Sequence, residues 1–350
     1  MGVTRDPVDA ADTRPLTIND IAAMTGLSKS TVSRALNSRP GVSAGARMRI
    51  DDALSQSGFV PARSARALST GRTGLIALLV GENRDPNVLT FISGAVGVAD
   101  QSDLHVVVGV SASERNNYDV YQQLLASRVV DGAILVWPPS KDREVISKFV
   151  EQRFPLVAIE PQKPFPGVPA VYADARHDGL IVTEHLVDRG HRRIAIALNT
   201  PGWGEQDRLL EGYRAGHRRA GITVDSELIR RDGWSFEAGG AAVASWARMK
   251  NPPTALMFNS DFAAMGAVSA IPDEWPAGAQ RPAVVGYDDT EILGWMNPPI
   301  TAPLDRRATL ARAAAEVLVD ILASRPVRDV TRLRTSLMVR GSSAMNVDVS

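Results

Sequence analysis

Short polar and basic side chains gather between residues 28 and 34, a stretch suited to hydrogen bonding with nucleic acid. Arg can fork onto O6 and N7 of guanine, and Ser or Lys can reach base edges in the major groove. In a helix beginning at Lys29, the outward face would carry Lys29, Ser30 and Arg34. Better placed for phosphate contacts are Ser28, Thr31 and Ser33. The alternative is a solvated helix face with no partner, so the neighbouring segments must decide.

Charge is unevenly distributed along the chain. The 350 residues include 39 basic and 39 acidic side chains, so the formal net charge is zero. Between Pro15 and Arg72, however, there are eight basic residues and three acidic ones, and no carboxylate occurs from Ser30 to Ile50. A basic N-terminal segment followed by a slightly acidic remainder is typical of a protein whose N-terminal end binds the phosphates of nucleic acid. Chance in a short window is the competing interpretation.

Three short helices are expected around this polar stretch. Thr17 is followed at the third helical position by an acid, which is typical of a helix start, and Gly26 permits a tight turn after this helix. Ser28 caps a second helix, and Ser43 caps a third that runs to about Gln56. A helix, a glycine turn, a second helix and a packing helix make up the helix-turn-helix plan of DNA-binding domains.

The run from Thr17 to Asn37 closely resembles the head of the lactose-repressor (LacI/GalR) family, and Val42-Ser43 and Gly58 to Pro61 extend the match. The resemblance implies a flexible tail at 1–14, a helix-turn-helix domain at 15–58 and a hinge helix or linker at 59–72. It also implies a sequence-specific transcription regulator. The DNA-binding residues that we expect are Thr17, Ser28, Lys29, Ser30, Thr31, Ser33, Arg34, Asn37, Arg63, Arg66 and Leu68.

The hinge segment that starts at Pro61 is rich in Ala, Arg and Leu, which are good helix formers. A helix of about eight residues is marginal alone in water. The resemblance implies that it folds on DNA against the partner subunit's hinge, with Leu68 wedged into the minor groove and Arg63 and Arg66 near phosphates. An ordinary linker leucine is the alternative. The family usually has Asn at the position of Ala62. We therefore expect the hinge to bind DNA with lower sequence specificity.

Beyond Gly74, apolar strand-like segments alternate with helical ones. Strands are predicted at 75–80, 105–110, 132–137, 154–159, 193–198, 255–258 and 283–286, and helices at 88–101, 117–127, 179–189, 207–220, 238–249 and 306–322. Repeated strand–helix units imply doubly wound parallel sheets, and two such sets predict two lobes.

The resemblance implies the same plan, an α/β two-lobed domain like periplasmic sugar-binding proteins, with three crossovers between the lobes. We therefore expect an effector-binding and dimerisation domain at 73–341 and a tail at 342–350. The first lobe would comprise 73–174 and 303–326, and the second lobe 175–302 and 327–341. A last strand from Leu333 to Arg340 would finish in the second lobe.

Ligands of such folds bind at the carboxyl ends of strands, which here would face a cleft between the lobes. The resemblance makes Arg208 and Asp288 effector-contacting residues. Arg offers a fork of donors and a carboxylate accepts from hydroxyls, as a polyol requires. Alternatively, neither residue contacts an effector: Arg208 would form a surface ion pair, and Asp288 would cap a helix. The further effector-binding residues that we expect are Asp178, Asp174, Trp234, Ser260, Asp261, Trp137 and Asn87.

The expected effector is a sugar or a sugar phosphate, in a pocket altered in detail from the family pattern. The family often has an Asn-Pro-Phe-Phe-like stretch where Asp85 to Val88 stands, and Ser260 replaces its usual Asn. Effector binding would change the angle between the lobes and so fold or melt the hinges. The residues leave open whether the effector releases DNA or tightens the grip on it.

Several classes of protein and site are disfavoured. The chain has no Cys, its five His show no metal spacing, and no catalytic motif is present, so we expect no catalytic residue, no cofactor, no metal and no enzyme. Residues 1–14 lack the apolar run of a secretory signal, and no stretch of about 18 apolar residues would span a membrane. We therefore expect a cytoplasmic protein with no membrane partner.

The expected partners are operator DNA, a small carbohydrate and a second copy of the chain. The tail after Gly341 lacks leucine heptads, which favours a dimer over a larger assembly. A solute-binding protein of related fold would need an export signal and no helix-turn-helix, and a sugar-modifying enzyme would need a catalytic cluster.

Overall fold

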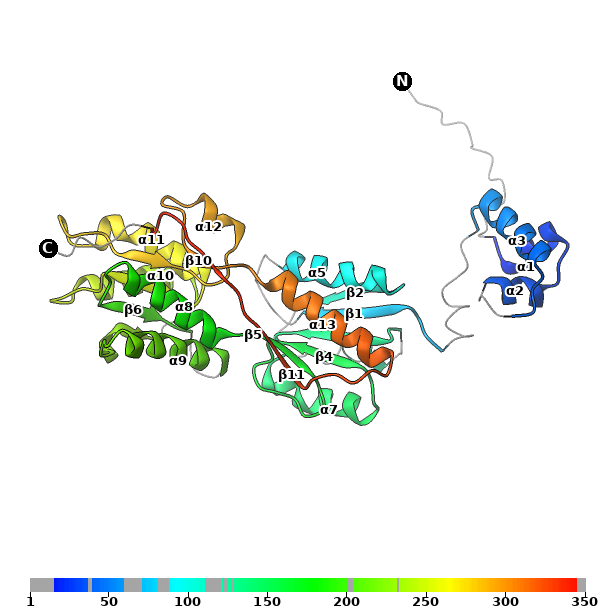
Figure 1. The fold of residues 1–350 in the computed structure, drawn as a ribbon, viewed down its shortest axis with the longest axis horizontal. Coiled ribbons are helices and arrows are strands. Elements are labelled where there is room, and N and C mark those ends of the chain that lie inside the picture. The colour runs from blue at the N-terminus through cyan, green and yellow to red at the C-terminus, as the bar shows by residue number, and fades with distance from the viewer. Residues whose placement is uncertain are drawn as a thin grey trace, which may run out of the picture. The chain divides into compact units, whose positions relative to one another are not determined.

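The structure is a computed structural model and describes residues 16–36, 40–59, 71–80, 88–110, 121, 125–126, 129–199, 204–231 and 233–344. The chain divides into two units, Met1–Gly74 and Leu75–Ser350 (Figure 1). This division falls close to the predicted boundary between linker and body. Among the described helices, none is both long and apolar enough to cross a membrane.

The first unit contains the three predicted helices, α1 (Ile18–Thr25), α2 (Lys29–Leu36) and α3 (Ala44–Ser57). The Asp20 carboxylate accepts hydrogen bonds from the N–H and the hydroxyl of Thr17, both at 2.7 Å, which fixes the start of α1. Gly26 ends this helix with φ of 64°, a left-handed conformation that glycine adopts without steric cost. A small core holds the three helices together and includes Ile21, Val32, Ala35, Ile50 and Ala53.

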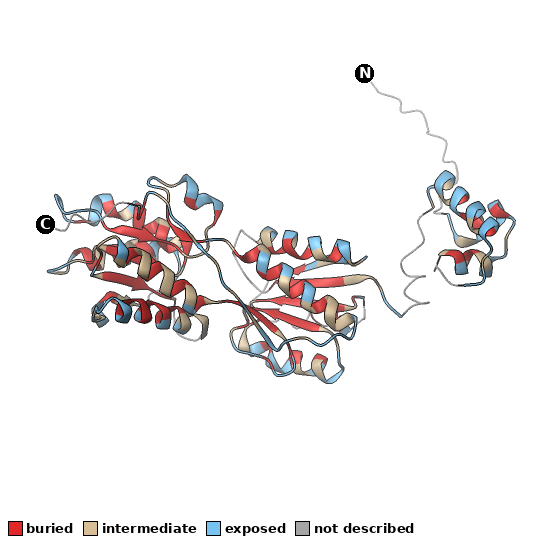
Figure 2. Ribbon diagram, viewed as in Figure 1, coloured by how far each residue is buried: buried red, intermediate tan, exposed pale blue. Residues whose placement is uncertain are grey.

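The first lobe of the second unit has a six-stranded parallel sheet in the order β11-β5-β4-β3-β1-β2. Its strands are β1 (Leu75–Val80), β2 (His105–Val110), β3 (Gly132–Val136), β4 (Leu156–Ile159), β5 (Ala170–Ala173) and β11 (Val330–Leu333). Its helices are α5 (Val88–Gln101), α7 (Arg143–Glu151), preceded by the short turn η2 (Ser140–Asp142), and α13 (Arg307–Leu322). β1, β3 and β4 are almost wholly buried, as Figure 2 shows, because helices cover both faces.

The second lobe has a four-stranded parallel sheet in the order β7-β6-β8-β9. Its strands are β6 (Ile194–Ala197), β7 (Ile229–Arg230), preceded by the short turn η3 (Ser226–Leu228), β8 (Ala255–Phe258) and β9 (Ala283–Val285). Its helices are α8 (Ala175–Asp188), α9 (Gly204–Arg219), α10 (Phe236–Ala247), α11 (Asp261–Glu274) and α12 (Glu291–Trp295).

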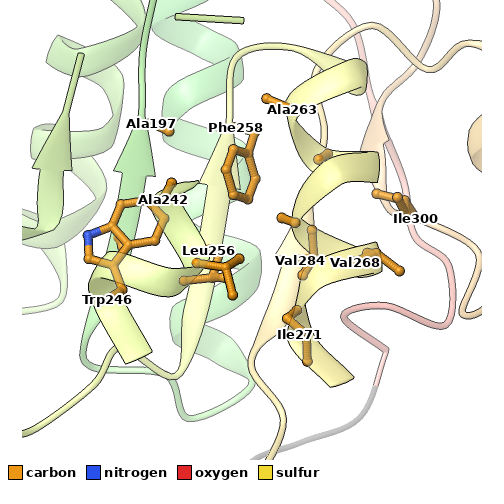
Figure 3. Packing of buried hydrophobic residues seen from close by; sticks show 14 of the residues in the cluster. Ala197, Ala242, Trp246, Leu256, Phe258, Ala263, Val268, Ile271, Val284 and Ile300 are labelled. Carbon is orange, nitrogen blue, oxygen red and sulfur yellow. The ribbon is translucent and has the colours of Figure 1, made fainter. Parts of the chain in front are cut away.

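Two hydrophobic clusters fill the second lobe, one on each face of its sheet. In Figure 3, Trp246 of α10 and Phe258 of β8 lie among small side chains, with Ile271 and Val268 of α11 on the far side. On the other face, α8 packs closely on α9 because both helices carry glycine at the contact. A Cβ on Gly179 or on Gly212 would collide with backbone of the facing helix.

The chain passes between the lobes three times, as the family resemblance implies: from β5 to α8, from β10 (Ala302–Pro303) to α13, and from β11 to β12 (Leu337–Met338). One predicted boundary is wrong. β11 pairs in parallel with β5, so 330–333 lies in the first lobe rather than in the second. The predicted strand from Leu333 to Arg340 is replaced by a crossover and by β12, which pairs with β10.

Candidate functional site

The outer face of α2 presents the polar side chains that the sequence singles out. Val32 and Ala35 are buried, whereas Lys29, Ser30 and Arg34 are exposed. The Arg34 Nε donates to the Ser30 carbonyl oxygen at 3.3 Å, so the arginine side chain lies back along the helix toward its N-terminus. The N-terminal half of α2 therefore offers two basic groups, those of Lys29 and Arg34, and several hydroxyls to a partner.

The start of α2 is fixed by a short network of hydroxyl groups. The Ser28 Oγ accepts from the Thr31 N–H at 3.2 Å and lies 2.8 Å from the hydroxyls of both Ser30 and Thr31. Ser28 is exposed and Thr31 is half-buried, as is Ser33. Thr17 is exposed at the start of α1. The other predicted DNA contacts, Asn37, Arg63, Arg66 and Leu68, lie outside the described residues.

A second group of functional side chains lies where the crossovers join the two lobes. We call it the inter-lobe cluster and define it by its ion pairs and ring contacts. Its members are Trp137, Glu160, Asp174, Asp178, Glu205, Arg208, Tyr287, Asp288, Arg306, Arg307, Arg332 and Arg334. They come from the carboxyl ends of β3, β4, β5, β9 and β11 and from the first turns of α8, α9 and α13. This is the edge at which doubly wound sheets bind ligands.

Asp178 and Arg306 form the most deeply buried ion pair of the cluster, with Arg306 Nη1 3.0 Å from Asp178 Oδ2. The guanidinium also stacks on the Tyr287 ring at 4.6 Å from its centre. Burial raises the pKa of the Asp178 carboxyl to about 6, with the nearby Arg306 charge acting in the opposite direction. The other carboxylate oxygen, Oδ1, is buried without a hydrogen-bond partner, so the site keeps one open acceptor.

Arg208 lies in the first turns of α9 and has two carboxylate neighbours. Its Nη2 is 3.5 Å from Asp174 Oδ1, and its Nε is 3.6 Å from Glu205 Oε2. Asp174 is the N-cap of α8 and also accepts from the Arg334 guanidinium at 3.3 Å. Although partial burial acts to raise it, the pKa of Asp174 is lowered by the His177 N–H and by Arg334. Arg208 and Asp174 are thus brought together, as expected for two residues of one site.

Asp288 follows β9 and contacts the start of α13. Its carboxylate is 3.5 Å from Arg307 Nη2, and its carbonyl oxygen accepts from Arg307 Nη1 at 3.3 Å. The loop that carries Asp288 is held by Asp261, whose carboxylate accepts from the N–H groups of Tyr287, Asp288 and Thr290 at 2.8–2.9 Å. The structure thus gives Asp261 a positioning role, since backbone donors occupy both of its oxygens.

Ser260 and Trp234 lie together, next to the start of α11. The Ser260 hydroxyl caps α11 and donates to the Trp234 carbonyl oxygen at 2.8 Å. The Trp234 ring packs edge-on against Phe262 and is 44% exposed. Ser260 therefore positions the segment that carries Trp234, and the exposed indole remains the group of this pair that can contact a ligand. Asn87, another predicted effector residue, lies outside the described residues.

Trp137 and Glu160 stand at the carboxyl ends of the neighbouring strands β3 and β4. The Trp137 Nε1 donates to Glu160 Oε2 at 3.1 Å, and Glu160 Oε1 accepts from the Ala173 N–H at 3.2 Å. Both residues have positive φ, 49° and 45°, a conformation that is uncommon outside glycine and that concentrates at binding and catalytic sites. Trp137 is thus locked in place, with its ring edge-on to Phe91 at 4.9 Å.

Sequence reasoning missed seven members of the inter-lobe cluster, among them Tyr287, Arg307 and Arg334. The other four are Glu160, Glu205, Arg306 and Arg332. A signal existed for Glu160, because it directly follows the strand predicted at 154–159 and strand ends carry sites. For Glu205, Arg306 and Arg332, the contacts join segments more than a hundred residues apart, and no local pattern marks such pairs. Among the described residues, no group of three or more His, Asp or Glu side chains is arranged to hold a metal ion.

Two family models match the chain, in the order that the two structural units suggest. Residues 17–62 match the model for bacterial regulatory proteins of the lacI family, and residues 183–343 match a periplasmic binding protein-like domain. The first match covers α1 to α3 and begins at Thr17. The second covers most of the second lobe, the crossovers to and from α13, and α13 itself.

Full-length relatives agree with this assignment. The HTH-type transcriptional repressor CytR of Escherichia coli (strain K12) is 27% identical over 330 residues, 93% of this chain and 96% of CytR. The ribose operon repressor of the same strain is 26% identical over 332 residues, 93% of this chain and 99% of the repressor. The crystal structure of the lac repressor dimer bound to operator and the anti-inducer ONPF matches with a TM-score of 0.78 at 25% identity. That match covers 95% of this chain and all of the repressor chain.

The two family models together give a helix-turn-helix domain followed by a periplasmic binding protein-like domain, and the solved structure matches this fold over most of the chain. The helix-turn-helix domain carries the exposed polar face of α2, and the two-lobed α/β unit carries the inter-lobe cluster. The chain therefore has a helix-turn-helix domain of the lacI family of bacterial regulatory proteins at residues 17–62, followed by a periplasmic binding protein-like domain, and it is a DNA-binding transcriptional regulator.

Proposed function

We propose that the protein is a dimeric, cytoplasmic repressor whose affinity for operator DNA is set by an uncharged sugar bound at the inter-lobe cluster. The single observation that carries the proposal is the open acceptor of Asp178, a buried carboxylate oxygen without a hydrogen-bond partner in a cluster where Arg208 Nε and Arg306 Nη1 also lack one. A buried acceptor left unpaired is costly, and a ligand hydroxyl would satisfy it. We propose no catalytic step, in keeping with relatives that are repressors.

The charges of the inter-lobe cluster favour a neutral sugar over a sugar phosphate. Each of its five arginines has a carboxylate within 3.6 Å: Arg208, Arg306, Arg307, Arg332 and Arg334. A phosphate would have to displace one of these carboxylates, whereas hydroxyl groups would donate to them. In the proposed site, Arg208 and Asp288 bind hydroxyls, and Trp137 and Trp234 offer ring surfaces.

Two relatives support the proposals that the protein binds operator DNA, forms a dimer and responds to a sugar. The lac repressor structure is that of a dimer bound to operator together with a small molecule, and another relative represses a ribose operon. In the proposed complex, Lys29, Ser30 and Arg34 contact base edges, while Ser28, Thr31, Ser33 and Thr17 contact phosphates. Asn37, Arg63, Arg66 and Leu68 would complete the interface, and Asn87 the effector site.

The test is a fluorescence-anisotropy titration of the full chain against fragments of its own genome, repeated with neutral sugars and with their phosphates. We expect one class of fragments to bind with a salt-sensitive affinity that a neutral sugar changes. The direction of that change decides between release and tightening. A regulator whose DNA affinity no sugar alters, or one that responds only to sugar phosphates, would contradict the proposed effector.

A further inference from the structure

We infer that the ion pair between Arg332 and Glu205 is a latch between the two lobes, which holds them at their present angle and fixes the first turn of α9. Arg332 belongs to β11, the edge strand of the first lobe's sheet. Glu205 is the second residue of α9 in the second lobe. The Arg332 Nη1 donates to both carboxylate oxygens of Glu205, at 2.9 and 3.0 Å.

The position of Glu205 distinguishes this pair from the other contacts between the lobes. The pairs Arg306–Asp178 and Arg334–Asp174 join residues that lie in or beside the crossover segments, so these two ion pairs stay near the axis about which the lobes would turn. Glu205 lies about thirty residues beyond the first crossover, in a helix that contacts lobe 1 through this carboxylate. Its distance from Arg332 therefore depends on the angle between the lobes.

Arg332 is prepared for this contact by its neighbour in the sheet. In the parallel register of β11 and β5, Arg332 lies beside Tyr172, and its guanidinium stacks over that ring at 4.6 Å. Tyr172 is 97% buried, so the surface on which Arg332 lies is rigid. Ordinary surface ion pairs contribute little because two long side chains must be immobilised. Here stacking has already restricted one of them.

Glu205 is equally well placed for the second half of the contact. A carboxylate in the first turn of a helix is favoured by the unpaired N–H groups and by the helix dipole. Its side chain is only 22% exposed, which limits screening by salt. Burial raises the pKa of Glu205, and the Arg332 guanidinium opposes that shift and helps to keep the carboxylate charged.

The latch also positions Arg208, one turn further along α9. Glu205 Oε2 is 3.6 Å from the Arg208 Nε, so the carboxylate that binds Arg332 also orients the arginine that we assign to the effector. Arg208 then contacts Asp174, which Arg334 holds. Arg332 and Glu205 are thus positioning residues. Their consequence for effector binding rests on the proposed function, whereas the latch itself does not.

The experiment measures the distance between the lobes without any effector, so its failure can be distinguished from failure of the proposed function. The chain has no cysteine, and therefore two introduced cysteines take spin labels without background. Glu151 of α7 and Arg218 of α9 are exposed and lie in different lobes. Labelled E151C/R218C chains are mixed with excess unlabelled chains, and pulsed electron–electron distance measurements then report distances within one chain.

Arg332→Gln and Glu205→Gln are each introduced into the labelled chain. We expect both to shift or broaden the distance distribution and to accelerate amide hydrogen exchange in 208–211, whose N–H groups bond to the carbonyl oxygens of the first turn of α9. The double variant should show no more than the larger single effect, because both substitutions remove the same contact. Arg332→Lys should fall in between, since lysine keeps the charge and loses the planar guanidinium that stacks on Tyr172.

The matched control is Glu184→Gln, which removes the ion pair from Arg219 of α9 to α8, entirely within the second lobe. It should leave the distance distribution unchanged. Circular dichroism verifies that each variant is folded, and two variants from different lobes guard against one that is not. The latch is refuted if both folded variants give the wild-type distribution and exchange rates, or if Glu184→Gln gives the same shift.

Discussion

The α2 face and the inter-lobe cluster differ in how far their polar side chains are buried and in how distant their partners are along the sequence. On α2, Lys29, Ser30 and Arg34 are exposed, and the hydrogen bonds of Ser30 and Arg34 that the described residues show join neighbours within about one turn of the helix. In the inter-lobe cluster, Asp178 and Arg306 are almost fully buried and join parts of the chain that are far apart in sequence. Substitutions on the α2 face should therefore change binding and spare the fold, whereas substitutions in the cluster should change both.

The largest effect on stability is expected from Asp178→Ala, which would leave the Arg306 guanidinium buried without its carboxylate. Breaking a buried pair in this way costs about 3–5 kcal/mol. Urea denaturation of the full chain measures the loss. Glu184→Ala, on the same helix and in an exposed pair, is the control and should cost about 0–1 kcal/mol. Equal costs for the two variants would mean that the cluster is no more structural than the surface.

Arg34→Ala tests the exposed α2 face, where a substitution should change DNA binding and leave the fold intact. Loss of an arginine that reads a guanine should weaken operator binding by about 1–3 kcal/mol and relax base preference at one position. Stability should change by less than about 0.5 kcal/mol, because Arg34 is exposed and its hydrogen bond within the described part of the chain goes to a carbonyl of its own helix. Anisotropy titrations and thermal unfolding measure the two quantities. Unchanged affinity and unchanged base preference would show that α2 is not the recognition helix.

Ser28→Asp separates helix capping from phosphate contact at one position. Aspartate caps a helix as well as serine does, so α2 should keep its stability. The new negative charge would face DNA phosphate, and we expect operator affinity to fall by roughly 1 kcal/mol or more. Ser28→Asn, which caps without charge, is the control. If Asp and Asn at this position bind the operator equally well, Ser28 does not lie against phosphate.

An effect that depends on pH is expected from His191, which is buried beside Thr254 in the second lobe. Burial, assisted by Arg189, lowers its pKa from 6.5 to about 4. The folded state thus favours the neutral ring, and its contribution to stability is present above pH 6.5 and is lost as the pH falls toward 4.

His191→Asn removes that titration. The difference in unfolding temperature between the wild type and this variant should therefore shrink as the pH falls from 6.5 to 4. Scanning calorimetry at a series of pH values measures it. A difference that stays constant over this range would show that His191 is protonated equally in the folded and unfolded states.

Local pattern explains what the sequence predicts well. The strands at 75–80, 105–110 and 255–258 and the helix at 88–101 have the predicted bounds, because continuous apolar runs and helical spacing are local signals. The three head helices follow from their caps and from Gly26. The sequence pattern does not predict β5, α7 and α11, and it assigns 330–333 to the second lobe, whereas β11 pairs with β5 in the first. An edge strand with half its side chains exposed carries no apolar run.

The predicted effector residues also show that local sequence pattern identifies strand and helix ends but not contacts set by tertiary packing. Arg208, Asp174, Asp178 and Asp288 come together in the inter-lobe cluster, since each follows a recognisable strand end or begins a helix. Asp261 and Ser260 instead bond to backbone, a role that depends on which loops fold over the start of α11. Such contacts are set by tertiary packing, and spacing along the chain does not reveal them.

The three passages of the chain between the lobes have a consequence for synthesis. The first lobe receives α13 only after residue 322 and its edge strand β11 only after residue 333. Until then, the face of its sheet that α13 covers, which includes Ile76, Ile134 and Val157, has no complete cover. Neither lobe can finish folding before the last part of the chain has left the ribosome. A growing chain would thus display aggregation-prone surface for most of its synthesis, and chaperones that bind apolar segments should associate with it.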